Sequence, residues 1–151
     1  MASSALEILD LLISIEKAMW RLYLDYAMQF HSEPEHYAFW QNIAMEEVEH
    51  ASFLESENQI ISAISELQFI QFVNPQKLEE VFAEIQQKRT EFDHTPYPHQ
   101  QAIQVARGLE MGYNEHLLRH SIKTEFPQIR NIIETLGSMN EKHIQLLTQA
   151  V

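Results

Sequence analysis

The stretch Glu46-Glu47-Val48-Glu49-His50-Ala51-Ser52-Phe53-Leu54 decides how this chain folds and where its polar chemistry lies. Within it, Glu47 and His50 stand three residues apart in a strongly helical run, so that both side chains fall on one face of an α-helix. A carboxylate and an imidazole on one face can meet a single ion, and helical bundles that hold two metal ions use a Glu-x-x-His pair in this way. The pair alone is also typical of a solvated helix face, and the rest of the chain decides between the two interpretations.

The composition predicts one all-α domain over residues 1–151. The chain has 45% hydrophobic residues and is long enough to bury a substantial core. Glycine occurs only three times, and no stretch shows the sustained alternation of a β-strand.

Charge and cysteine content narrow the classes of function. With 22 acidic and 10 basic residues, the formal charge of −12 argues against a nucleic-acid partner and is compatible with attracting cations or with simple solubility. Cysteine is absent, which rules out disulfides and thiolate metal sites and suits a reducing compartment. Neither a signal peptide nor a membrane span is recognisable, and we expect a cytoplasmic protein without a membrane partner.

Four long helices are expected. Capping boxes at Ser4 to Glu7 and at Ser32 to Glu35, the second with Pro34 in the first turn, predict the starts of the first two. The expected helices run from Ser3 or Ser4 to about Phe30, from Ser32 to about Leu67, from His99 to Lys123, and from Thr124–Pro127 to the C-terminus. Gly137 could interrupt the last one before His143, but one continuous helix is preferred because a single glycine costs only about 1 kcal/mol.

The connection from Gln68 to Pro98 is the longest in the chain. A short helix is predicted within it, from Asn74-Pro75 to about Arg89. A connection of this length can cross the whole length of a bundle, which would allow the second and third long helices to run parallel.

Polar residues interrupt the apolar stripes of all four long helices. They are Glu16, Glu47, His50, Glu110, Asn140 and His143. From Glu16 to His50 is 34 residues and from Glu110 to His143 is 33, so each half of the chain repeats a glutamate, a helix turn and a histidine. Buried carboxylates without a cation would have to be protonated or to recruit an ion, which is the physical argument for metal here.

Two segments carry a resemblance to a known family. Ile15-Glu16-Lys17-Ala18-Met19-Trp20-Arg21-Leu22-Tyr23 and Met45-Glu46-Glu47-Val48-Glu49-His50-Ala51 resemble the ligand segments of the first and second helices in the rubrerythrin branch of the ferritin-like superfamily. The resemblance implies a four-helix bundle with one long crossover. It also implies that Glu16 and His50 bind one metal ion, that Glu47 bridges, and that Glu110 and His143 bind a second ion. Tyr23 matches a tyrosine that this family places near the metal pair, although a core tyrosine is an equally good interpretation.

The activity implied by the resemblance is reduction of peroxide or O2, or oxidation of Fe(II), at two iron ions, with manganese as the alternative metal. Proteins of this family usually carry a cysteine-ligated electron-transfer domain, so here a separate electron donor is expected; the resemblance also implies a homodimer. Asn140 departs from the pattern, because the family has a glutamate three residues before the last histidine. A neutral amide cannot supply a bridging charge, so the second ion should bind weakly or not at all. A single-metal site and a non-catalytic scaffold or dimerisation domain therefore remain as alternatives.

Other histidines and aromatic residues have simpler interpretations. His116 and His120 have the spacing of a helical zinc pair but lack the surrounding zinc-protease pattern, and a solvated face is preferred. His94 and His99 are expected in a loop. Trp20 and Trp40 are interpreted as core or subunit-interface residues.

Overall fold

The computed structural model describes residues 3–64, 71–72, 75–123 and 127–150 and is all-α. Its helices within these ranges are α1 (Ala5–Gln29), α2 (Pro34–Ala63), α4 (Gln76–His94), α5 (His99–Lys123) and α6 (Pro127–Ala150). The two-residue strands β1 (Ser3–Ser4) and β2 (Gln71–Phe72) form one antiparallel pair, in which Ser3 lies opposite Phe72 and Ser4 opposite Gln71.

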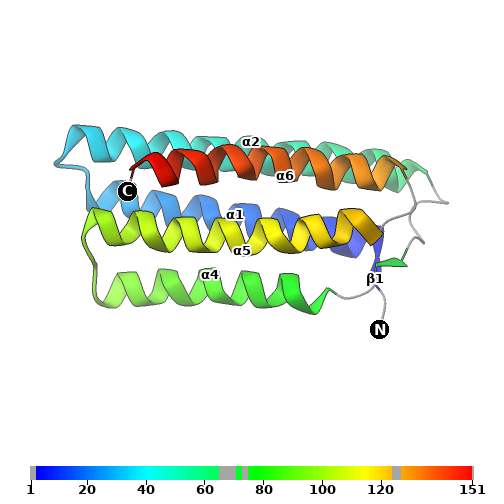
Figure 1. Ribbon diagram of the computed structural model, residues 1–151, viewed down its shortest axis with the longest axis horizontal. Helices are drawn as coiled ribbons and strands as arrows, with labels where there is room; N and C mark the ends of the chain where they lie inside the picture. Colours follow the sequence, from blue (N-terminus) through cyan, green and yellow to red (C-terminus); the bar gives the residue numbers. More distant parts are fainter. Residues whose placement is uncertain (1–2, 65–70, 73–74, 124–126, 151) are drawn as a thin grey trace.

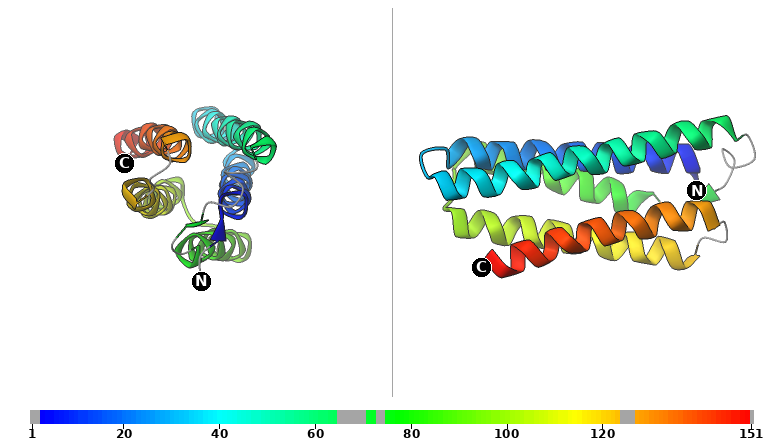
Figure 2. Two further views of the ribbon diagram at one scale, coloured as in Figure 1. Left: turned by 90° about the vertical axis from the view of Figure 1, so that its right-hand side faces the viewer. Right: turned by 90° about the horizontal axis from the view of Figure 1, so that it is seen from above.

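The helices lie side by side along one long axis (Figure 1). Figure 2 shows α2 and α6 next to each other on one side, α1 and α5 behind them, and α4 on the outside against α1 and α5. The chain reverses direction between α1 and α2 and again between α4 and α5. Because α4 runs back along most of the bundle, α2 and α5 begin at the same end and point the same way (Figure 1).

The helix boundaries agree with the predicted ones in part. The prediction for α5 is confirmed, and α6 is continuous through Gly137. In contrast, α2 ends at Ala63 rather than near Leu67, and α4 extends beyond Arg89 to His94.

The predicted cap at Ser32 is wrong. Glu33 is the N-cap residue of α2 and makes no side-chain hydrogen bond to the first turn, while Pro34 occupies the first helical position. Proline there has a fixed φ suited to a helix and lacks only an N–H that would have no partner in the helix, so it can start α2 without a capping hydroxyl. The side chain of Ser4, in the other predicted capping box, lies outside the described part of the structure.

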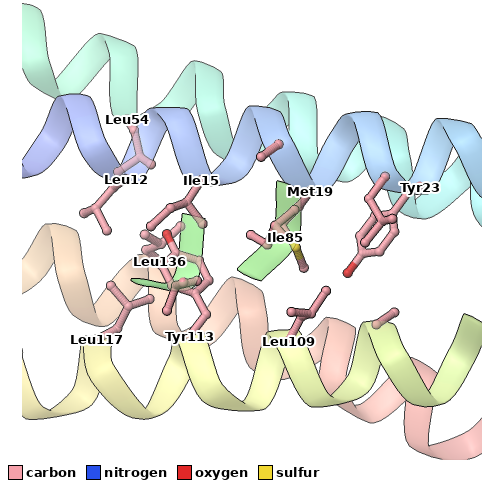
Figure 3. Close-up of a cluster of buried hydrophobic side chains, with 14 of the residues drawn as sticks. Leu12, Ile15, Met19, Tyr23, Leu54, Ile85, Leu109, Tyr113, Leu117 and Leu136 are labelled. Carbon is pink, nitrogen blue, oxygen red and sulfur yellow. The ribbon is translucent and has the colours of Figure 1, made fainter. Parts of the chain in front are cut away.

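The core lies between α1 and α5 and continues between the other helices. Figure 3 shows Leu12, Ile15 and Met19 of α1 facing Leu109 and Leu117 of α5. Each large aliphatic side chain buried here contributes about 1.5–3 kcal/mol from removal of its surface from water. Among the described residues, none of the helices has both the length and the hydropathy needed to cross a membrane.

Candidate metal centre

Six polar side chains from four helices lie in the middle of this apolar core. They are Glu16 of α1, Glu47 and His50 of α2, Glu110 of α5, and Asn140 and His143 of α6. Each of the three glutamates exposes at most 1% of its surface, and His50, the most accessible of the six, exposes 5%. The prediction that Glu16, Glu47 and Glu110 face inward is therefore confirmed, while their role as ligands remains a prediction.

Glu47 lies between the two histidines and faces one with each of its oxygens. Its Oε2 is 3.5 Å from Nδ1 of His50, and its Oε1 is 2.7 Å from Nδ1 of His143. The two imidazole rings are stacked with centroids 4.7 Å apart. Glu47, His50 and His143 could hold a metal ion, because one ligand atom from each lies within 4.8 Å of the other two.

A second carboxylate approaches each histidine from the other helices. Oε2 of Glu16 is 3.4 Å from Nδ1 of His50, and Oε1 of Glu110 is 3.4 Å from Nδ1 of His143. The centre therefore consists of two similar halves that share Glu47. One half contains Glu16 and His50, and the other contains Glu110 and His143, as the repeat in the sequence predicted.

Two tyrosines connect these carboxylates across the bundle. Tyr23 of α1 donates a hydrogen bond of 2.7 Å to Oε1 of Glu110 on α5, and Tyr113 of α5 donates one of 3.1 Å to Oε1 of Glu16 on α1. Figure 3 shows the two phenol groups reaching in opposite directions across the space between α1 and α5. Sequence reasoning placed Tyr113 only among the core residues; the signal for its role was its position three residues after Glu110, on the same helix face.

Glu46 is a further residue at this centre that sequence reasoning missed. Its Oε2 lies 2.5 Å from Nε2 of His143, whose Nδ1 faces Glu47 and Glu110. Histidines that bind metal commonly donate their second ring N–H to a carboxylate, which fixes the ring orientation and tautomer. Glu46 can therefore hold His143 with Nδ1 directed at the shared centre, while its own side chain stays 45% exposed.

An open groove between α2 and α6 reaches this centre from the surface. It has a volume of about 510 Å³ and is lined by residues that include Glu46, Glu49, His50, Met139 and Lys142. His50 and the outer carboxylate of Glu46 are thus reachable for a small solute, although the three core glutamates are closed off from water.

Burial and mutual proximity shift the pKa values of these groups strongly. Burial raises the pKa of Glu16, and the neighbouring carboxylate of Glu47 raises it further, against the opposing effect of His50. Burial alone would lower the pKa of both histidines, but hydrogen bonds and charge from the glutamates outweigh it. Glu16 and Glu47 raise the pKa of His50 to about 10, and Glu110 and Glu47 raise the pKa of His143 to about 11. Both imidazoles are therefore protonated at neutral pH and act as cations inside the acidic cluster.

Several buried atoms of the centre have no hydrogen-bond partner in the described part of the chain. They are Oε2 of Glu16, both oxygens of Glu47, Nδ1 of His50 and both amide atoms of Asn140. Leaving a buried polar atom unpaired costs about 1–3 kcal/mol, and more if it is charged. These oxygens of Glu16 and Glu47 and Nδ1 of His50 face one another and His143, in ion-pair contacts of 2.7–3.5 Å. A convergent set of oxygen and imidazole nitrogen atoms suits a divalent cation of the first transition row. The residues present therefore fit a metal ion.

Asn140 marks the difference between the two halves. It is fully buried three residues before His143 on α6, where a glutamate would have added a fourth carboxylate to the core. Nearby, Oδ1 of buried Asn114 also has no hydrogen-bond partner among the described residues, and it lies 3.4 Å from the position that a Cβ on Gly137 would occupy. On α6 the centre therefore has one neutral amide, Asn140, beside His143.

His94, His99 and Trp40 are not among the six side chains of this centre. The prediction that His94 and His99 are loop residues is wrong, because they are the last residue of α4 and the first residue of α5. Trp40 is fully buried, in agreement with a core role. The side chain of His120 is outside the described part of the structure, so the zinc-pair alternative with His116 stays a prediction.

Comparisons with protein-family models, with curated proteins and with solved structures found no match for this chain. The fold and the site thus define an all-helical protein with a buried group of glutamates and histidines that could bind a metal ion.

Proposed function

We propose that this protein is a ferritin-like four-helix protein of rubrerythrin type that binds two iron ions, or manganese, and reduces peroxide or O2 or oxidises Fe(II). The observation that carries the proposal is the placement of Glu47, with one oxygen directed to each histidine in the core of the bundle. The parallel direction of α2 and α5, with α4 running back between them in sequence, supports the ferritin-like arrangement (Figure 1).

The chain's own residues would divide the binding between the two halves. Glu16, Glu47 and His50 would hold one ion, and Glu47, Glu110 and His143 the other, with Asn140 as a weak neutral donor beside the second. Iron or manganese at such a mixed carboxylate and imidazole site supplies one-electron redox steps and open coordination positions. His50 and His143 must first lose the proton on Nδ1. The positive charge of the two imidazoles in the metal-free protein would then be replaced by that of the bound metal ions.

The tyrosines would hold the carboxylates in position and keep their own protons. Burial raises the pKa of both Tyr23 and Tyr113, and the nearby carboxylates raise it further, so each phenol remains a hydrogen-bond donor. Tyr23 would in addition present its hydroxyl to the reacting oxidant at the Glu110 side of the centre. The groove beside Glu46 and His50 would admit a small oxidant such as peroxide, while the core around Glu47 stays dry.

A non-catalytic helical scaffold is the second candidate, and Asn140 favours it. A buried amide with both polar atoms unpaired is what remains if a bridging carboxylate is lost and the metal is no longer needed. In this alternative the three glutamates are neutralised by the two imidazoles and by protonation rather than by metal ions.

Metal analysis separates the two candidates. Protein purified without chelator is analysed for metal, then loaded anaerobically with Fe(II) and mixed with peroxide. The proposed enzyme should bind two iron ions per chain and show an oxidant-dependent absorption change, and Glu47→Gln should abolish both. Glu57→Gln, which changes a partly exposed glutamate on the same helix, serves as the matched control. If no iron is retained after anaerobic loading, the scaffold is correct.

A further inference from the structure

Four aromatic side chains form a continuous row from the metal centre to the surface at the end of the bundle where α2 and α5 begin. The row starts at Tyr23, whose hydroxyl is bonded to Glu110. The ring centroid of Tyr23 is 5.6 Å from that of Trp40, and Trp40 is 4.7 Å from Tyr26. Tyr26 is 6.0 Å from Tyr97, and their hydroxyl groups are 2.5 Å apart. We call these four residues the aromatic row.

The row crosses the boundary between core and solvent. Tyr23, Trp40 and Tyr26 are each fully buried, whereas Tyr97 is partly exposed in the short connection between α4 and α5. Pro96 and Pro98 flank Tyr97 and restrict its backbone, and Phe92 packs edge-on against its ring at 4.7 Å. An aromatic cluster that only filled the core would not require a ring held at the surface in this way.

We propose that the aromatic row carries electrons from an external one-electron donor at Tyr97 to the metal centre. The proposal rests on the proposed function, which has an oxidant at the centre and no reductant within the chain. Tyrosine and tryptophan are the side chains that can be oxidised reversibly by one electron, and all four members of the row are one of the two.

The hydrogen bonds of the row provide places for the protons that move with the electrons. The indole N–H of Trp40 donates a 3.0 Å hydrogen bond to Nδ1 of His99. Burial lowers the pKa of His99, and the stacked ring of His36 lowers it further, so this imidazole is neutral and can take the proton of an oxidised indole and return it. With Tyr26 as the donor in the pair of phenols, Tyr97 can release its own proton to water while the hydrogen bond is retained.

The electron balance closes with a donor and an oxidant of stated class. In each transfer Tyr97 loses one electron toward the oxidised centre and one proton to water. The external donor then returns the electron, and water returns the proton. Two such transfers, with two protons from solvent at the centre, convert one hydrogen peroxide into two water molecules and leave two oxidised donors. The row itself is unchanged after each transfer.

A metal-free experiment tests the row without any turnover. The chain has two tryptophans, and Trp20 is partly exposed whereas Trp40 exposes none of its surface. Protein without metal, and protein loaded with redox-inactive Zn(II), is exposed to a photogenerated ruthenium(III) polypyridyl oxidant, which cannot enter the core. Mass spectrometry then measures oxidation at each tryptophan. We expect Trp40 to be oxidised in the wild type and several-fold less in Tyr97→Phe, with Trp20 oxidised equally in both. Tyr37→Phe, which changes a partly exposed tyrosine outside the row, should match the wild type.

A second measurement uses the iron-loaded protein. After one equivalent of peroxide without reductant, freeze-quench electron paramagnetic resonance should show a tyrosyl radical signal, and labelling with ring-deuterated tyrosine should narrow it. The signal should be lost or shifted in Tyr97→Phe and unchanged in Tyr37→Phe. Suppose that the iron loads and is oxidised by peroxide, but that Trp40 is protected equally in wild type and Tyr97→Phe and the radical signal is the same in both. Electron transfer along the aromatic row is then refuted, while the proposed function stands. If the iron does not load, the proposed function fails, and the metal-free experiment alone decides whether the row conducts.

Discussion

Tyr23 of α1 donates a 2.7 Å hydrogen bond to Glu110 of α5. The reciprocal bond from Tyr113 to Glu16 makes the relationship symmetric, because each helix presents a carboxylate and a phenol to the other. A buried carboxylate keeps a fixed direction only if something holds one of its oxygens. In Glu16 the phenol takes Oε1, and Oε2 faces His50 at the shared centre.

Removing one of these phenol groups should destabilise the metal-free protein. Tyr113→Phe takes a hydrogen bond away from buried Glu16 and leaves a carboxyl oxygen without a partner, which costs about 1–3 kcal/mol. We expect a loss of that size in the free energy of unfolding, measured by urea denaturation of protein without metal. Tyr37→Phe is the matched control and should change the free energy by about 0.5 kcal/mol or less. Equal values for the two variants would show that the bond to Glu16 contributes nothing.

The pH dependence of stability should differ between metal-free and loaded protein. The pKa values of His50 and His143 are about 10 and 11 in the folded chain, against 6.5 for the model side chain. The folded state therefore binds more protons than the unfolded state above pH 6.5, so the stabilisation is complete below that pH and is lost as pH rises toward 10. Saturating Zn(II) removes these protons from the folded state, so stability should instead rise with pH between about 5 and 7.

Thermal unfolding midpoints at several pH values, with and without Zn(II), measure this difference. We expect the midpoint of the metal-free protein to fall between pH 7 and pH 10, and the fall to be absent or much smaller with Zn(II). The exposed variant His94→Ala should keep the fall seen in metal-free wild type. A midpoint that is independent of pH in the metal-free protein would contradict the ion pairs of the two buried histidines.

Glu46 should act on metal binding through His143. Loss of the carboxylate behind a metal-binding histidine typically lowers affinity about 10–100-fold. Glu46→Ala should therefore weaken one of two ions by that amount in a calorimetric titration and leave the ion near Glu16 and His50 unchanged. Glu49→Ala, in the same groove on the same helix, removes an equal charge without contact to His143. Identical titrations for the two variants would mean that Glu46 contributes only general charge.

Restoring a carboxylate at position 140 should strengthen the second half of the centre. Asn140→Glu adds a negative charge three residues before His143, which should tighten the second ion and lower the stability of the metal-free protein, because a further buried carboxylate is unpaired. Asn131→Glu adds the same charge at an exposed position of α6 and should do neither. An unchanged stoichiometry and affinity in Asn140→Glu would show that this position does not face the second ion.

The sequence predicts much of this structure because its signals are local and periodic. The stripe containing Glu110 lies on α5, where proline before His99 and a long periodic pattern define the helix, and its bounds are confirmed. The end of α2 and the extension of α4 to His94 were not predicted, since helix ends depend on tertiary packing as much as on the local sequence.

The missed members of the site were missed for a different reason. Glu46 precedes Glu47, and a step of one residue turns a side chain about 100° around the helix, away from the core face. The carboxylate of Glu46 reaches Nε2 of His143 only because α6 lies beside α2. Tyr113 has an ordinary core position in the sequence pattern. Its hydrogen bond to Glu16 depends on how close α1 and α5 lie, which hydrophobic periodicity does not predict.

The most direct test of the account is an anomalous-scattering map of crystals loaded anaerobically with Fe(II). We expect two iron peaks in the core, one among Glu16, Glu47 and His50 and the other among Glu47, Glu110 and His143. A single peak, among Glu16, Glu47 and His50, would contradict the binding of a second ion. A core without any peak, with all three glutamates still buried and the histidines paired to them, would contradict metal binding as the purpose of this centre.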